Sequence, residues 1–128
     1  MRPALIVAVF AGGAVGALLR AGLAELWPSG DGEWPWGTLT ANLVGTVLLA
    51  LVATTMTAGR DPRRIWRALV GTGFCGALTT FSTFQIEVIA LVREGHVAMG
   101  VSYAVVSLIV GLGVVVAVGF GARGVRSR

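Results

Sequence analysis

Lysine is absent from this chain of 128 residues, cysteine occurs once, and charged residues make up only 12% of the sequence. A soluble domain carries about 25% charged residues, so this shortage argues against an ordinary soluble fold. The single cysteine, Cys75, excludes an intrachain disulfide and is alone no metal site, so we interpret it as a small packing residue. The sequence also lacks a catalytic dyad, a metal-ligand cluster, a Walker motif and a Rossmann glycine pattern, which argues against an enzyme.

Charge is also missing from long stretches of the chain. Residues 37–58, 68–86 and 97–122 contain no charged residue, and residues 3–24 contain only Arg20. A run of about 18 or more apolar residues is typical of a transmembrane helix, and the first stretch is too long for the core of a cleaved signal peptide. The sequence therefore predicts an all-α membrane protein that forms a single domain over residues 1–128. Its four transmembrane helices are expected at about residues 3–26, 37–58, 65–92 and 97–122.

Because lysine is absent, the net charge of +4 comes entirely from arginine, and nearly all arginines lie just outside the apolar stretches. This placement is typical of membrane topology and not of a nucleic-acid-binding face. Eight arginines fall on one predicted side of the membrane: Arg2, Arg60, Arg63, Arg64, Arg67, Arg123, Arg126 and Arg128. The other side has Arg93, with Arg20 inside a helix near it. The positive-inside rule then predicts a multi-pass protein of the cell membrane with both termini in the cytoplasm.

Small residues recur at helical spacing within these stretches. Gly12 and Gly16 form a GxxxG step in the first, and Ala41 and Gly45 form a similar step in the second. Such steps let helix backbones approach closely in lipid. They are consistent with packing inside a four-helix bundle and equally with association with a second chain.

The third stretch is unusual because residues 71–84 combine three glycines with five hydroxyl residues. Glycine weakens a helix, and hydroxyl side chains compete for its backbone hydrogen bonds. We therefore predict a helix broken near the middle of the membrane, with free carbonyls near Gly76 and free amides near Thr80. Carbonyls at such a break can hold a cation, and amides can attract an anion. The alternative is a continuous helix whose hydroxyls bond back to its own backbone.

Uncharged polar and aromatic side chains follow helical spacing around this segment. Phe81 and Phe84 are three residues apart, and the positive edges of such rings can solvate an anion, although packing against lipid or core is the commoner role. Thr38, Asn42 and Thr46 recur every four residues in the second stretch, as Tyr103 and Ser107 do in the fourth. They predict either hydrogen bonds between helices or a track of donors for an anion that binds weakly enough to be released.

Three segments of the sequence resemble the Fluc, or CrcB, family of fluoride channels. They are residues 37–46 around Asn42, the run 76–84 (GALTTFSTF), and residues 12–20, which are similar to the first-helix motif of that family. The resemblance covers nearly the whole chain. It implies an antiparallel dimer of four-helix subunits, with the third helix broken near its centre. It also implies a passive channel that exports cytoplasmic fluoride and so confers resistance to it.

The resemblance also implies roles for individual residues. The fluoride pathway would be formed by Asn42, Phe81, Ser82, Thr83, Phe84, Tyr103 and Ser107. Backbone carbonyls of Gly76 and Thr79, together with the partner chain, would hold a structural sodium ion at the dimer centre. The chain departs from the family pattern at Ala77, Ala21 and Gly111, which affects details of the pore.

The strong arginine asymmetry leads us to hypothesise that this chain pairs with an oppositely oriented homologue and not only with a second copy. A proton-coupled multidrug exporter is an alternative function, although Glu25 lies at the end of the first helix and not deep within it. A non-conducting assembly subunit is another.

Two charged residues within the predicted helices each have two interpretations. Glu87 is expected at an interface or vestibule, or else in ion access or gating. Arg20 is expected in helix packing or in attracting an anion.

Overall fold

The computed structural model describes residues 2–56 and 61–126, so the predicted roles of Arg60 and Arg128 fall outside the described residues. The described backbone contains no strand and forms α1 (Pro3–Leu26), α2 (Trp36–Thr55), α3 (Asp61–Trp66), the π-helix η1 (Arg67–Cys75), α4 (Gly76–Leu78), α5 (Phe81–Arg93) and α6 (Val97–Arg126). Within this described part of the chain, four segments are long and apolar enough to cross a membrane: Pro3–Leu26, Trp36–Thr55, Arg63–Arg93 and Val97–Ala122. The predicted all-helical protein with four membrane spans is therefore confirmed.

The ends of the spans coincide with residues that start or stop helices. Pro3 opens α1 in the first helical turn, where its missing amide costs no hydrogen bond. Pro35 immediately precedes α2, which ends at Thr55, earlier than the predicted residue 58. Gly32 and Gly95 lie in the turns between spans and have positive φ angles of 68° and 90°. Glycine adopts such angles without steric cost.

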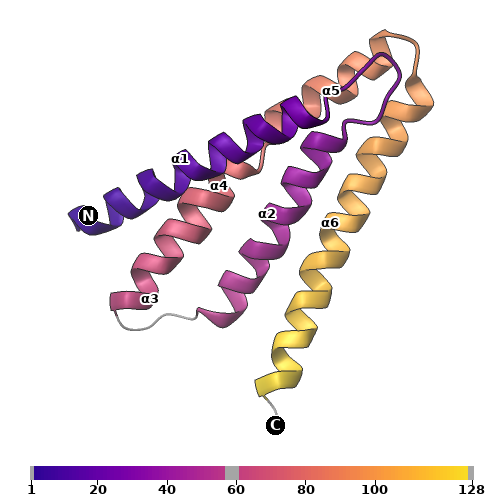
Figure 1. Cartoon of the computed structure of the whole chain (residues 1–128). Coiled ribbons are helices and arrows are strands. Elements are labelled where there is room, and N and C mark those ends of the chain that lie inside the picture. The colour runs from indigo at the N-terminus through magenta and orange to yellow at the C-terminus, as the bar shows by residue number, and fades with distance from the viewer. Residues whose placement is uncertain (1, 57–60, 127–128) are drawn as a thin grey trace.

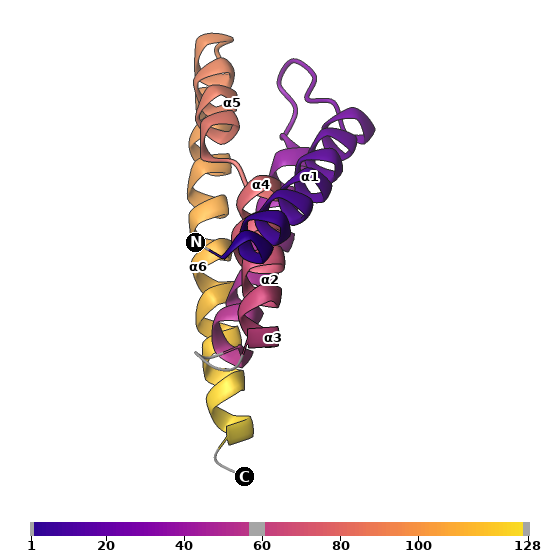
Figure 2. The same ribbon diagram turned by 90° about the vertical axis from the view of Figure 1, so that its left-hand side faces the viewer.

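α2 lies between the first half of the third span (α3, η1 and α4) and α6, whereas α5, its second half, runs beside the first part of α6 (Figures 1 and 2). The loops at residues 27–35 and 94–96 lie at one end of the molecule, and the C-terminal end of α6 lies at the other. The two loops are joined by a contact of 3.1 Å between His96 Nε2 and Asp31 Oδ1.

α1 crosses η1 and α4 with their backbones in close contact (Figure 2). A methyl group added at Gly12 would overlap the carbonyl oxygen of Leu69, and one at Gly16 would overlap the carbonyl oxygen of Phe74. A methyl group at Gly73 of η1 would in turn meet the Val9 carbonyl oxygen at 2.5 Å. The GxxxG step of the first span is therefore used for packing within the chain.

The buried core of the described residues is small, as expected for a single membrane-spanning chain. Leu39, Leu91 and Tyr103 form one buried cluster, and Cys75 and Leu78 are also buried. Cys75 is 1% exposed, in agreement with its interpretation as a packing residue. Large apolar side chains cover the outside of the helices instead, which suits contact with lipid or with another chain.

Candidate functional site

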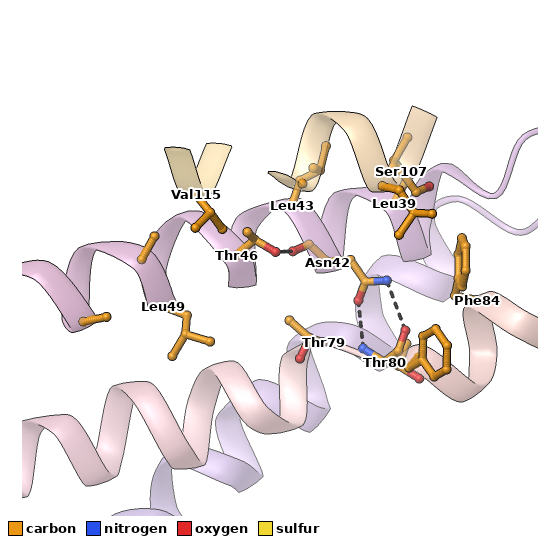
Figure 3. Close-up of a pocket in the computed structure, with 15 residues that line it drawn as sticks. Leu39, Asn42, Leu43, Thr46, Leu49, Thr79, Thr80, Phe84, Ser107 and Val115 are labelled. Carbon is orange, nitrogen blue, oxygen red and sulfur yellow. Dashed lines mark hydrogen bonds between the residues drawn. The ribbon is translucent and has the colours of Figure 1, made fainter. Parts of the chain in front are cut away.

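The regular backbone of the third span stops at two residues in extended conformation. Thr79 has φ −77° and ψ 148°, Thr80 has φ −146° and ψ 124°, and helix resumes at Phe81. In an uninterrupted α-helix, the Thr80 amide would donate to the Gly76 carbonyl four residues earlier. It donates instead to Asn42 Oδ1 at 2.8 Å, while Asn42 Nδ2 donates to the Thr80 carbonyl at 3.1 Å (Figure 3). One amide side chain from α2 thus pairs with both backbone groups of Thr80.

Arg20 of α1 satisfies a further backbone group beside these extended residues. An uninterrupted helix would pair the Ala77 carbonyl with the Phe81 amide. Here Arg20 Nε donates to that carbonyl at 3.0 Å. A guanidinium within an apolar span is costly unless it is paired, and this contact supplies a partner. The structure therefore favours the packing interpretation of Arg20 over a role in attracting anions.

α5 begins with a side-chain cap at Thr80. Thr80 Oγ1 accepts a hydrogen bond from the Thr83 amide at 3.2 Å and donates to Thr83 Oγ1 at 3.0 Å. This is the usual way in which a threonine satisfies a free amide at a helix N-terminus. Ser82 is exposed, and its hydroxyl lies 3.4 Å from that of Thr80. The predicted hydroxyls of Ser82 and Thr83 are thus close to the start of α5, and that of Thr83 already has a partner within the chain.

The two phenylalanine rings lie together on the same side of α5. The ring centroids of Phe81 and Phe84 are 6.0 Å apart with an interplanar angle of 26°, so the rings stack. Phe81 is 69% exposed, whereas Phe84 packs against the buried Tyr103 with ring centroids 5.2 Å apart. The pair therefore extends from the inside of the subunit to its surface.

A cavity of about 510 Å³ lies where α2, α5, α6 and the extended residues meet (Figure 3). Its wall is mostly apolar, with a few uncharged polar groups. The predicted residues that line it are Asn42, Thr79, Phe81, Phe84 and Ser107, together with Thr46 and Thr80. Ser107 Oγ is buried and, within the described part of the chain, has no hydrogen-bond partner. This hydroxyl is therefore available to a ligand, whereas Thr46 Oγ1 donates back to the Asn42 carbonyl at 2.7 Å.

Tyr103 lies apart from this cavity in a separate polar cluster. Its hydroxyl donates to Glu87 Oε2 at 2.9 Å, and Thr38 Oγ1 donates to Glu87 Oε1 at 2.6 Å. Tyr103 is fully buried and Thr38 is 8% exposed, so the cluster joins α2, α5 and α6 inside the subunit. Sequence reasoning assigned these three residues separately and missed that they bind one another.

Gly76 faces away from the cavity toward open space, since a methyl group added there would meet no atom within 4 Å. Within the described residues, no group of three or more histidine, cysteine, aspartate or glutamate side chains could hold a metal ion. A cation at this position would therefore depend on backbone oxygens such as those of Gly76 and Thr79, which are ligands that hard cations prefer.

Comparisons with known proteins agree with the motifs in the sequence. A family model described as "CrcB-like protein, Camphor Resistance (CrcB)" matches residues 7–120. A relative from Mycobacterium bovis, named "Fluoride-specific ion channel FluC 1", is 45% identical over 107 residues, which cover 84% of this chain and 81% of the relative. A relative of the same name from Cutibacterium acnes is 41% identical over 113 residues, covering 86% and 79%. The "Fluoride-specific ion channel FluC" of Variovorax paradoxus is 46% identical over 91 residues, covering 71% and 72%. The family predicted from the motifs is confirmed, and the chain belongs to the CrcB family.

Proposed function

We propose that this chain is a fluoride-selective passive ion channel of the cell membrane that exports cytoplasmic fluoride and so confers resistance to it. The main support for the proposal is the similarity to relatives named as fluoride-specific ion channels, which for the Mycobacterium bovis relative covers more than four fifths of both chains. The same relatives support a channel over a multidrug exporter or a non-conducting assembly subunit. Because curated members of the family are ion channels, the prediction that the chain is not an enzyme is confirmed.

The chemistry of the cavity supports fluoride as the transported ion. Fluoride is small and strongly hydrated, so a pore must replace its water with hydrogen-bond donors that do not bind too tightly. Asn42 Nδ2 carries two hydrogens, and its bond to the Thr80 carbonyl uses only one of them. The unpaired Ser107 hydroxyl adds a second donor, and no charged side chain lines the cavity. The edges of the Phe81 and Phe84 rings add weakly positive surfaces.

The proposed fluoride pathway includes every residue that the sequence predicted for it, and these residues act at different places. We propose that Asn42, Phe81, Phe84 and Ser107 contact the ion from the cavity wall. Ser82 and Thr83 would act at the start of α5, and Tyr103 would act from the Glu87 cluster beside the cavity. The proposed pathway residues are Asn42, Phe81, Ser82, Thr83, Phe84, Tyr103 and Ser107.

An antiparallel second subunit completes the proposed channel. Extended backbone cannot face hydrocarbon, and it is tolerated at membrane depth only where protein or a wet cavity surrounds it. A partner packed over the exposed Phe81 ring and the open side of Gly76 would supply that cover. The Thr80 amide bonds to Asn42 and so leaves the Gly76 carbonyl without its helical donor. The carbonyls of Gly76 and Thr79 could then hold a structural sodium ion together with those of the partner.

Fluoride efflux from proteoliposomes, followed with a fluoride-selective electrode, tests the function. The wild-type channel should release fluoride but not chloride. Efflux is measured for the chain expressed alone and for the chain co-expressed with a homologous subunit, and full efflux from the chain alone would show that a homologous partner is not required. Phe81→Ile and Phe84→Ile should each slow fluoride efflux at least about tenfold, since an aliphatic side chain has no positive edge. Phe10→Ile is the matched control, because Phe10 is 78% exposed on α1 and lines no described cavity. Equal efflux from all variants would rule out the ring-edge role, and chloride efflux as fast as that of fluoride would rule out the proposed selectivity.

A further inference from the structure

A second cavity lies at the arginine-rich end of the molecule, between α2, the N-terminal part of α1 and the start of the third span. It has a volume of about 360 Å³. We call it the arginine pocket, and it is lined by Leu5, Leu49, Val52, Ala53, Arg64, Arg67, Ala68, Gly71 and Thr72. A smaller neighbouring cavity of about 130 Å³ shares Arg64 and Leu5 and adds Arg2, Ala4 and Ile65. The arginine pocket shares Leu49 and Ala53 with the cavity around Asn42 but none of its polar residues, and the smaller cavity shares no residue with it.

The arginine pocket contains two positively charged side chains and, among the described residues, no acidic one lines it. Arg64 and Arg67 are three residues apart, so they lie on the same face of the helix. None of the lining residues is acidic, and within the described residues neither guanidinium forms an ion pair or a hydrogen bond. Two like charges held together without a counter-ion repel one another. An anion bound between them would remove that repulsion.

The other wall of the arginine pocket is apolar, and this limits the kind of anion that fits. Leu5, Leu49 and Val52 line the same cavity as the two arginines. Trp66 lies between the arginines in the sequence and is 55% exposed, and exposed tryptophans mark the level of the lipid headgroups. A guanidinium pair beside an aliphatic wall at headgroup depth matches a molecule with an anionic phosphate next to hydrocarbon. Basic pockets between transmembrane helices are known to bind such headgroups.

We propose that the arginine pocket binds the headgroup of an anionic phospholipid. Arg64 and Arg67 bind the phosphate, for which the planar guanidinium fork is suited, and the upper part of an acyl chain lies against Leu5, Leu49 and Val52. The bound lipid contacts α1, α2 and the third span at once, so it holds the three spans together. The proposal concerns a site separate from the ion pathway and does not depend on the transported ion.

The test compares phosphatidylglycerol with phosphatidylcholine of the same acyl chains, each added to the detergent-purified full chain. Retained lipid is measured by native mass spectrometry, and the unfolding temperature is measured alongside. Wild-type protein should retain phosphatidylglycerol preferentially and unfold at a higher temperature with it. Each arginine near a membrane surface contributes about 1 kcal/mol, so Arg64→Gln and Arg67→Gln should each reduce the preference about fivefold. The double variant should lose nearly all of it.

Arg63→Gln is the matched control, because it removes the same charge from the same helix at an exposed residue that lines no described cavity. This variant should keep the wild-type preference. An equal loss in Arg63→Gln would show general surface attraction and overturn the site. Wild-type protein with no preference for phosphatidylglycerol would overturn it without any variant.

Two further measurements separate the lipid from other anions. Inorganic phosphate that stabilises the protein as much as phosphatidylglycerol would show a site for free phosphate and overturn the lipid proposal. Fluoride efflux is also measured in vesicles of phosphatidylcholine alone. A fall in efflux for the double variant there, with lipid preference unchanged, would make the pocket a vestibule for the ion and not a lipid site.

Discussion

Asn42 is the residue on which the extended conformation of Thr80 most depends, because its side chain pairs with both the amide and the carbonyl of that residue. Asn42→Ala should leave both groups without partners and lower the free energy of unfolding by about 2 kcal/mol or more. The variant should also abolish fluoride efflux, because it removes the second Nδ2 hydrogen of Asn42, which we propose donates to the ion. Unfolding in detergent and efflux from proteoliposomes measure the two effects. Thr46→Val is the control, because Thr46 bonds only to its own helix, and a loss as large as that of Asn42→Ala would contradict the assignment.

Glu87 accepts hydrogen bonds from two side chains of the same subunit, and these contacts support a structural role. Tyr103→Phe removes one donor, at 2.9 Å from the carboxylate, and Thr38→Val removes the other, at 2.6 Å. Each should lower the free energy of unfolding by about 1–3 kcal/mol because a half-buried carboxylate oxygen loses its partner. The two effects should not be additive, since both donors bind the same group.

The same pair of variants tests whether Glu87 gates the channel. A structural cluster predicts that Tyr103→Phe lowers stability more than it lowers fluoride efflux. Ser102→Ala is the control in the neighbouring position, because Ser102 bonds only to the Met99 carbonyl of its own helix. Normal stability combined with a large change in efflux would favour the gating interpretation instead.

The sequence predicted which residues of the site share a helical face, but not which polar groups are already paired. The four-residue spacing placed Asn42 and Thr46 on one side of α2 and Tyr103 and Ser107 on one side of α6. Only the structure shows that the hydroxyls of Thr46 and Tyr103 are engaged and that of Ser107 is not. Spacing fixes direction along one helix, whereas pairing depends on how helices cross.

At the level of the elements, the crossing of α1 and η1 depends on glycines whose hydrogens touch a neighbouring backbone. Gly12→Ala and Gly16→Ala should each destabilise the fold by about 1–3 kcal/mol, because the added methyl overlaps a carbonyl oxygen that only a backbone shift could move. Gly22→Ala is the matched control in the same helix, where a methyl group meets nothing within 4 Å. It should keep or slightly raise stability, since alanine favours helix over glycine. Unfolding in detergent compares the three, and equal effects would contradict the close crossing.

The π-helix between Arg67 and Cys75 was not predicted from the sequence. The three glycines and five hydroxyl residues of segment 71–84 indicated a weakened helix, and extended residues do occur there at Thr79 and Thr80. The wider turns of η1 coincide with its contact against the glycines of α1. π-helical segments often occur at functional sites, and the sequence carries no composition that separates them from α-helix.

At the scale of the whole molecule, charge is concentrated at one end, and this bears on how two chains would assemble. A homodimer of antiparallel subunits needs one sequence to insert in both orientations, which favours a weak arginine bias. The eight arginines predicted on one side make a strong bias in the sequence. We therefore expect this chain to insert mainly in one orientation and to pair with an oppositely oriented homologue.

Cysteine labelling of intact cells measures that orientation directly. Cys75→Ala removes the native thiol, which is buried, so the labelling reagent has no other thiol to react with. Glu94→Cys then places a single thiol in the exposed turn between α5 and α6. If the arginine-rich end is cytoplasmic, a membrane-impermeant maleimide should label nearly all of this thiol from outside. Replacing Arg2 and Arg63 with glutamine should raise the unlabelled fraction, because it weakens the bias that sets the orientation. Labelling of about half of the wild-type chains would mean that the sequence inserts both ways despite its charge, and the channel would then assemble from two identical subunits.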